Sequence, residues 1–261
     1  MNFTFGICVS QNTNPDFLDK QFGSILVAAD YLTYYEVILS GQITDECFSV
    51  AEKFADTMSV KLIPYEGPPD KHGHITKKKN MIAENAKYDM LCVMHDYFIL
   101  PPDFVNWVPL SKKTVYVCPI HTLEGGRHSD WAISPARMQE YINAEPSAAQ
   151  ELMAIAPHEN APKYVCGLPY LCEGLSSIQY ISGGLITLPT EILLDIRFDE
   201  NLYWGDAEDL EWSERLVKKY TLVTSGYSKN VHPIGILKPN KWNMPILTHE
   251  MVEKIRKHYG L

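Results

Sequence analysis

Several features that would place this chain in a familiar class are missing. The six cysteines form no Cys-x-x-Cys pair, and in a chain of 261 residues they indicate reduced, mostly buried thiols and a reducing compartment, although Cys166 and Cys172 could pair. No run of about 18 apolar residues predicts a membrane span. The opening MNFTFGICVS begins a strand and lacks the parts of a signal peptide. We therefore expect a soluble cytoplasmic protein.

An excess of positive charge is also missing. The chain carries 32 acidic and 23 basic side chains, a formal net charge of −9 and a pI near 5.5, which argues against nucleic acid or an anionic membrane as the main partner. A nucleotide-sized anion is still compatible with this charge, because a few local cations or one metal ion can hold it. The composition, 46% apolar and 21% charged, is that of an ordinary soluble globule with a sizeable core.

The first hundred residues alternate between short apolar runs and helical patterns. Such an alternation predicts an α/β fold with a mostly parallel sheet and right-handed crossovers. No Gly-x-Gly-x-x-Gly follows the first run, which weakens a dinucleotide-binding interpretation. The predicted strands are Phe3–Ser10, Tyr34–Leu39, Val60–Tyr65 and Met90–Met94, and the predicted helices cover residues 15–32, 45–57 and 76–86.

The second half is less regular. We expect strands at 114–119, 180–188 and 222–225, helices at 146–156 and 207–220, and a polar loop at 123–132. There is no internal repeat and no low-complexity linker. Residues 1–261 are therefore predicted to form one domain, with a nucleotide-binding half (1–100), a second half (101–235) and a C-terminal tail (236–261).

The fourth predicted strand runs directly into His95-Asp96-Tyr97. A strand that ends in an acid places the carboxylate at the carboxyl edge of the sheet, where ligands of open α/β sheets bind. Asp96 could bind a divalent metal there, with His95 as a further ligand or in contact with a ribose or phosphate. An Asp that caps a turn and a His with satisfied polar groups explain the same residues equally well.

Three acids, Asp206, Glu208 and Asp209, gather where the helix at 207–220 is expected to begin. Helix-start electrostatics alone can account for such a cluster. The functional interpretation is that one carboxylate acts as a general base, with Trp204 as an apolar platform for a sugar ring.

Three further patterns are weak evidence for a site when each is taken alone. The paired glycines of Ser182-Gly183-Gly184 predict a close backbone approach or a bulge. His232 is more often a structural residue than a ligand, unless a metal is bound at Asp96. His72-Gly73-His74 is weak evidence for a metal site and is predicted to be, at most, a loop near the donor side.

The order of these segments resembles that of GT-A glycosyltransferases. The strand-ending acid followed by Pro101-Pro102-Asp103-Phe104 resembles their metal-binding Asp-x-Asp segment, and Lys78-Lys79-Asn80 resembles the basic-Asn segment ahead of it. The glycine pair followed by Trp204-Gly205 and Glu208-Asp209 resembles the acceptor side of inverting members. The family-2-type and β-1,4-galactosyltransferase-like enzymes are the closest comparison, and the likeness runs from Phe3 to about His232.

The resemblance implies an inverting transfer of a sugar from a nucleoside diphosphate, with a UDP-sugar favoured, to a glycan or other hydroxyl acceptor. Asp209 would be the base and Glu208 would orient the acceptor. Asp96, His95 and His232 would hold a divalent cation, Mn²⁺ or Mg²⁺. The acceptor site would comprise Ser182, Gly183, Gly184, Trp204 and Gly205. The donor site would comprise Ser10, Gln11, Asn12, Lys78, Lys79, Asn80, His95 and Asp96.

The sequence departs from the family pattern at the acidic triplet, which reads His95-Asp96-Tyr97. Either His95 and Asp96 form a reduced metal site, or cations such as Lys78 and Lys79 hold the donor. The end of the second strand, Ser40-Gly41-Gln42, lacks the acid that often reads uracil. A non-catalytic GT-A-like domain that binds a sugar nucleotide or glycan is the main alternative. A Rossmann-like methyltransferase or nucleotidyltransferase is a third, against which the missing glycine-rich loop counts.

Overall fold

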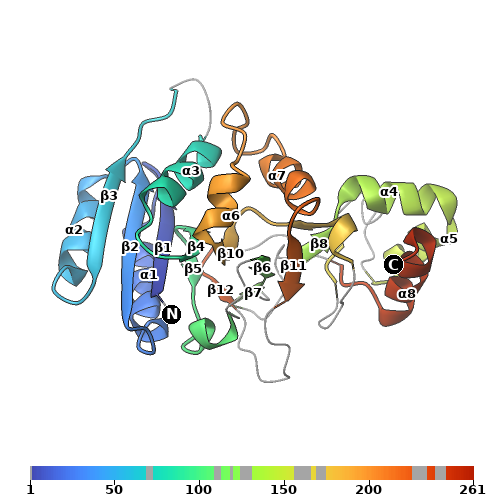
Figure 1. Cartoon of the computed structure of the whole chain (residues 1–261), viewed down its shortest axis with the longest axis horizontal. Coiled ribbons are helices and arrows are strands. Elements are labelled where there is room, and N and C mark those ends of the chain that lie inside the picture. Colours follow the sequence, from blue (N-terminus) through green and yellow to red (C-terminus); the bar gives the residue numbers. More distant parts are fainter. Residues whose placement is uncertain are drawn as a thin grey trace.

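A seven-stranded sheet runs through the protein in the computed structural model (Figure 1). Its strand order is β11-β6-β10-β4-β1-β2-β3. The structure describes residues 2–68, 73–108, 113–117, 120–123, 131–155, 166–168, 175–224, 234–238 and 245–261.

The N-terminal half has the predicted alternation of strands and helices. Strands β1 (Asn2–Val9), β2 (Tyr34–Gly41), β3 (Ser59–Pro64) and β4 (Met90–His95) are parallel, and their carboxyl ends share the upper edge in Figure 1. Helices α1 (Pro15–Ala28), α2 (Asp45–Phe54) and α3 (Ile75–Asn85) connect them. Side chains start two of these helices, since Asn14 accepts from the backbone of Asp16 and Phe17, and Thr44 from that of Cys47.

Side-chain alternation along the strands builds a core on each face of the sheet. Phe3, Phe5, Ile7 and Val9 of β1 belong to the cluster that includes the buried faces of α1 and α2. Cys8 belongs instead to the cluster that includes the buried residues of α3, α6 (Thr190–Asp195) and α7 (Glu208–Leu216). Both faces of the parallel strands are therefore covered, as their continuous apolar runs predict.

The second half departs from the expected strands at several places: the strands at Ile120–Thr122, Trp131–Ile133 and Ile234–Ile236 were not predicted, and the second of them begins inside the predicted loop 123–132. The predicted strand 180–188 is two strands, because the chain turns at residues 182–184. β9 (Gln179–Ile181) pairs with β8 (Trp131–Ile133), and β10 (Leu185–Pro189) enters the large sheet antiparallel between β4 and β6 (Thr114–Val117). Glycine at Gly184 permits this turn against Phe98, whose ring atoms would lie 3.1 Å from a Cβ there.

The other second-half elements complete the sheets. β11 (Thr221–Thr224) is parallel to β6, and β5 (Phe98–Ile99), β12 (Ile234–Ile236) and β7 (Ile120–Thr122) form a small three-stranded sheet. Short 3₁₀ helices cover Phe104–Trp107 (η1) and Ser176–Ile178 (η3).

Three helices gather at one end of the molecule (Figure 1). They are α4 (Pro135–Ala144), α5 (Ser147–Ile155) and α8 (His249–Tyr259), of which the sequence predicted only α5. Thr248 caps α8, whose Met251, Val252 and Ile255 are buried in the same core cluster as α4 and α5. An ion pair between Lys254 and Glu151 joins α8 to α5. The segment predicted as a tail therefore contributes to the core.

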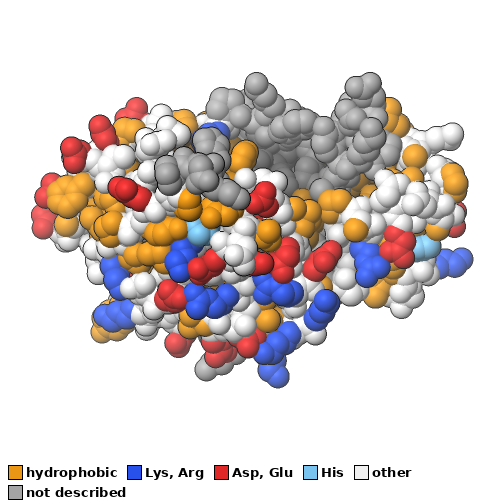
Figure 2. Space-filling view, turned by 90° about the horizontal axis from the view of Figure 1, so that it is seen from above, with side chains coloured by type: hydrophobic (Ala, Val, Ile, Leu, Met, Phe, Trp, Pro, Cys, Tyr) orange, Lys and Arg blue, Asp and Glu red, His pale blue; other side chains and the backbone are white. Residues whose placement is uncertain are grey.

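The lengths of the helices and the distribution of surface charge can be compared with the expectations of no membrane span and no nucleic-acid partner. Among the described residues, no helix combines the length and apolar character needed to cross a membrane. Basic side chains alternate with acidic ones across the middle of the face seen in Figure 2. That face presents no field of a single sign.

Candidate functional site

A polar cleft of about 660 Å³ opens at the carboxyl edge of the parallel strands. Open α/β sheets bind ligands at this edge. Its walls come from the segments that follow β1 to β4, from the start of α3 and from two segments of the second half. The lining residues are Ser10, Gln11, Asn12, Gln42, Tyr65, Glu66, Gly67, Pro68, Gly73, His74, Lys78, Asp96, Trp204 and Lys238.

Three predicted donor residues of this cleft, Ser10, Gln11 and Asn12, follow β1. Side chains hold their backbone in a turn: the Ser10 N–H donates to Thr13 Oγ1 at 2.8 Å, and the Asn12 N–H to Ser10 Oγ at 3.2 Å. The Gln11 N–H donates to Gln42 Oε1 at 3.1 Å, which joins the ends of β1 and β2. Gln42 directly follows β2 and lines the cleft. Its side chain is a neutral amide at the strand end where the sequence has no acid.

Lys78 reaches the cleft across the ends of β1 and β2. Its ammonium donates to the carbonyl of Val9 at 2.7 Å, and burial lowers its pKa, while the thiol of Cys8 and the carboxylate of Asp96 act in the opposite direction. Gly41 makes room for this path. A Cβ at Gly41 would lie 2.0 Å from the Val9 oxygen and 3.0 Å from Lys78 Cε, and the φ of +135° is unfavourable for other residues.

An aromatic wall on one side of the cleft was not predicted from the sequence. His74 Nδ1 is hydrogen-bonded to the Tyr65 hydroxyl at 2.5 Å, and Nε2 to the Glu200 carbonyl at 2.7 Å. The ring of Tyr203 stacks on His74 with centroids 4.5 Å apart. The His72-Gly73-His74 pattern predicted at most a loop near the donor side, and no sequence signal connects Tyr65, which follows β3, with Tyr203. His72 lies outside the described residues.

Lys238 is a second cation of the cleft, and no sequence pattern pointed to it. It follows β12, and its ammonium lies 4.2 Å from the centroid of the Tyr97 ring. Two ammonium groups and the Asp96 carboxylate therefore line the same space. Because the carboxylates of Asp96 and Glu66 balance these two positive charges, the lysines can contact a diphosphate without making the described lining positive overall.

Asn80 does not line the cleft. Its side-chain amide donates to the Phe198 carbonyl at 3.0 Å and to Glu200 Oε1 at 2.9 Å, and its oxygen accepts from the Phe198 N–H at 3.0 Å. Thr76 donates to the Leu202 carbonyl at 2.7 Å. Helix α3 thereby fixes the segment that leads to Trp204.

Trp204 is 62% exposed, and its N–H donates to the Gly73 carbonyl at 3.1 Å. The exposed side chain is one of those that line the cleft. Gly205 follows with φ +91° and has open space around it.

The acid pair Glu208-Asp209 begins α7, as the sequence predicts, but neither carboxylate lines the cleft. Asp209 Oδ2 accepts from the Gly183 N–H at 3.0 Å, and Oδ1 from the Leu210 N–H at 2.9 Å. Glu208 is 7% exposed. Burial raises the pKa of Glu208, the positive charge of Lys79 opposes this, and the negative charge of Asp209 adds to it.

Two other predicted residues lie beside this acid pair. Lys79 is fully buried, with its ammonium 4.5 Å from the Phe198 ring centroid, and it does not line the cleft. Ser182 is partly buried in the turn between β9 and β10. Gly184 accepts a hydrogen bond from the backbone of His95 at 2.9 Å, which connects the turn to the His95-Asp96 corner.

The predicted metal ligands do not come together within the described residues. His95 Nδ1 is hydrogen-bonded to the Tyr97 hydroxyl at 2.8 Å, and only Asp96 of the pair lines the cleft. His232 lies outside the described residues. In the part of the chain that the structure describes, no three His, Cys, Asp or Glu side chains are grouped as a metal site requires. The described ligands, His95 and Asp96, do not by themselves form a site for a divalent ion.

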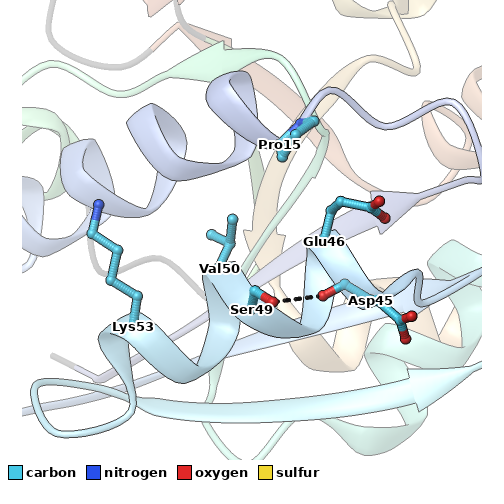
Figure 3. A pocket seen from close by; sticks show the side chains of 6 residues that line it. All are labelled: Pro15, Asp45, Glu46, Ser49, Val50 and Lys53. Carbon is cyan, nitrogen blue, oxygen red and sulfur yellow. Dashed lines mark hydrogen bonds between the residues drawn. The ribbon is translucent and has the colours of Figure 1, made fainter.

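A second depression, of about 510 Å³, lies between the start of α1 and the outer side of α2 (Figure 3). Ser49 donates to the Asp45 carbonyl at 2.9 Å, and Lys53 pairs with Asp19. Asp45 and Glu46 occupy the first turn of α2, where acids are favoured by the helix dipole. Helix structure therefore accounts for the charges of this depression.

Comparisons with known proteins identify the fold. No protein-family model and no curated protein matches the chain. Among solved structures, TarS 1–349 of S. aureus in complex with UDP-GlcNAc has a TM-score of 0.57 at 14% identity, covering 99% of this chain and 65% of that one. The mannosyltransferase PcManGT of Pyrobaculum calidifontis, in complex with GDP-Man and Mn²⁺, has a TM-score of 0.54 at 12% identity, covering 92% and 58%.

The fold is that of the GT-A glycosyltransferases. The predicted mostly parallel sheet flanked by helices is thus confirmed. The likeness to β-1,4-galactosyltransferases stays a prediction. This chain spans less than two thirds of each of the two structures described above, so an activity of those whole proteins is a matter for proposal.

Proposed function

We propose that this protein transfers a sugar from a nucleoside diphosphate to a hydroxyl acceptor, with inversion at the anomeric carbon. The observation that carries the proposal is the cleft, where Lys78 and Lys238 share a wall with Asp96 at the carboxyl edge of a GT-A sheet. Structures of proteins with this fold have been solved with UDP-GlcNAc and with GDP-Man. A UDP-sugar is the first donor to test, and a glycan hydroxyl is the first acceptor.

The lysines are proposed to bind the diphosphate. The family resemblance favours a divalent cation, Mn²⁺ or Mg²⁺, whose chemistry is to neutralise the leaving diphosphate. Because the described side chains do not fit such an ion, no step is assigned to it here. The ammonium groups of Lys78 and Lys238 supply the same charge, and Lys78 is already fixed by the Val9 carbonyl.

Asp209 is proposed as the general base. It takes the proton of the acceptor hydroxyl while that oxygen bonds to the anomeric carbon, and the bond from this carbon to the diphosphate oxygen breaks. The Gly183 N–H holds one oxygen of the carboxylate at 3.0 Å. Glu208 orients the acceptor, and Trp204 stacks on its sugar ring.

One observation favours a second candidate, a non-catalytic domain that binds a sugar nucleotide or glycan. The acid pair does not line the cleft, so a ligand in the cleft need not contact a base. The two candidates share the donor site and differ in turnover.

A thermal-shift panel tests the donor site. UDP, GDP and CDP and their sugars are added in buffer with Mn²⁺ and in buffer with EDTA. A ligand at 100 times its dissociation constant stabilises the native state by about 2.7 kcal/mol, so one base should raise the melting temperature. We expect the shift to persist in EDTA. The absence of a shift with every nucleotide would eliminate the donor assignment.

A coupled assay that detects the released nucleoside diphosphate then separates the two candidates. Release of diphosphate with the binding donor, increased by a mixture of glycan acceptors, supports the transferase. Binding without any release supports the non-catalytic domain.

A further inference from the structure

The buried ammonium of Lys79 has no role in the mechanism above. The side chain is fully buried, and its Nζ has no hydrogen-bond partner within the described part of the chain. The ring of Phe198, 4.5 Å away, provides a cation–π contact. Burying a charge is costly unless an opposite charge compensates it, so the position of that opposite charge is informative.

Lys79 and the acid pair meet at the turn that contains Gly183. A Cβ on Gly183 would lie 2.7 Å from Lys79 Nζ, 3.1 Å from Asp209 Cβ and 3.5 Å from Glu208 Oε1. The ammonium and the two acids therefore approach the same α-carbon. Because glycine has no side chain, the position that a Cβ would occupy between these groups is empty, and the N–H of this residue donates to Asp209 Oδ2.

The charges around Glu208 are few in the described structure. Lys79 of α3 is the cation that acts on it, and Asp209 of α7 is the neighbouring acid. Cys8 of β1 also interacts electrostatically with Lys79, but burial raises the pKa of that thiol to about 11, so it is neutral at physiological pH. The positive charge of Lys79 is therefore directed at the acid pair.

We propose that Lys79 is a positioning residue whose ammonium keeps the acid pair Glu208-Asp209 ionised and seated against Gly183. Without it, two adjacent acids, one of them buried, would share a site of low polarity, and protonation would relieve the repulsion. This role rests on the proposed transfer reaction, because a general base must be ionised before it can accept a proton.

A measurement of carboxyl titrations tests the charge coupling without any assay of turnover. In the full chain labelled with ¹³C at Asp and Glu carboxyls, the signals are assigned through Glu208→Gln and Asp209→Asn. Lys79→Met should raise the pKa of Glu208 by about one unit or more, since an opposite charge within several ångströms lowers a carboxyl pKa by about that much. Lys79→Arg should stay near the wild-type value.

Lys77→Met is the matched control. It removes a neighbouring charge of the same helix whose ammonium pairs with Glu200 at 2.7 Å, so the titration of Glu208 should not move. An unchanged pKa of Glu208 in Lys79→Met would overturn the proposal. If that variant does not fold, the wild type decides. The ¹⁵N signal of the Lys79 ammonium must then follow the titration of Glu208 and lose this dependence in Glu208→Gln, and a signal without this dependence also overturns it.

The pH profile of transfer connects the coupling with activity. In Lys79→Met the acidic limb of kcat should move to higher pH, while the KM for the donor stays unchanged and Lys79→Arg restores the wild-type profile. An active Lys79→Met enzyme with the wild-type profile would contradict the proposal. If the wild type transfers no sugar, the proposed function fails, and the carboxyl titration still decides whether Lys79 controls the acid pair.

Discussion

Two adjacent lysines lie in different regions, one at the open cleft and the other beside the acid pair. Lys78 reaches the cleft and donates to the Val9 carbonyl, whereas Lys79 is buried behind Gly183 beside Glu208. Both belong to helix α3, on which consecutive side chains point about 100° apart. One helix therefore supplies a cation to each region.

The two regions depend on charge in different ways. In the cleft, the Lys78 side chain is buried and its ammonium donates to the Val9 carbonyl, but the space that it lines is open, so a lysine there contributes mainly when an anion binds. Near Gly183, Lys79 and Glu208 are buried, so each charge is felt by its neighbours even without a ligand. Substitutions in the cleft should therefore change binding, and substitutions at the acid pair should change the chemical step.

The largest expected effect is on the acid pair. Asp209→Asn keeps the size of the side chain and removes the base, so the transfer rate should fall by about 10²–10⁴-fold, the usual contribution of general base catalysis. Donor binding by thermal shift should match the wild type. Glu208→Gln should cost less, because this residue is proposed only to orient the acceptor.

The ratio of the transfer rates of these two variants shows which acid is the base. If Glu208→Gln loses more activity than Asp209→Asn, the base is Glu208. Equal activity of Asp209→Asn and wild type would remove the acid pair from the mechanism.

The fold of the N-terminal half could be predicted because its signals are local. Asn14, Pro15 and Thr44 mark where helices start, and the continuous apolar runs mark strands buried on both faces. The prediction of a single strand at 180–188 was wrong, because the turn within it depends on tertiary packing. Residues 180–188 have the composition of one strand, and the close packing of Gly184 on Phe98 divides them.

The candidate site was predictable only in part, for the same reason. Asp96 and the turn after β1 follow directly from strand ends. Which of two adjacent lysines enters the cleft depends on how α3 rotates against the sheet, and no short-range pattern reports that. Lys238 reaches the cleft from a segment distant in sequence.

The next largest effect is expected on stability, at Gly41, where the cleft meets the sheet. Gly41→Ala places a Cβ 2.0 Å from the Val9 carbonyl at a φ of +135°, so unfolding in denaturant should show a loss of about 2–4 kcal/mol from strain and overpacking. Gly23→Ala is the control, since it lies in helix α1 with nothing within 4 Å and should gain about 0.5–1 kcal/mol. Equal effects of the two variants would mean that Gly41 is not constrained by the Lys78 path.

A moderate effect is expected in the cleft itself. Lys238→Met and Lys78→Met should each weaken nucleoside diphosphate binding about 10-fold, or about 1.4 kcal/mol, as measured by calorimetry at low salt. The difference from wild type should shrink as salt rises, because the cleft is open to solvent. Lys61→Met, an exposed lysine of β3 that contacts Asn85, should bind as wild type. Lysine variants with unchanged affinity would place the diphosphate elsewhere.

The smallest effect concerns the backbone that presents the acid pair. Ala207 has φ 59° and ψ 39°, a left-handed conformation at the residue before Glu208. Ala207→Gly should stabilise the fold by about 0.5–1 kcal/mol, because the strain of a non-glycine residue there exceeds the entropy that glycine adds to the unfolded chain. Ala55→Gly, at an exposed right-handed position with φ −60°, should instead destabilise by a similar amount. Destabilisation by both substitutions in chemical denaturation would show that the acid pair is presented without backbone strain, and its geometry would then depend on Gly183 and Lys79 alone.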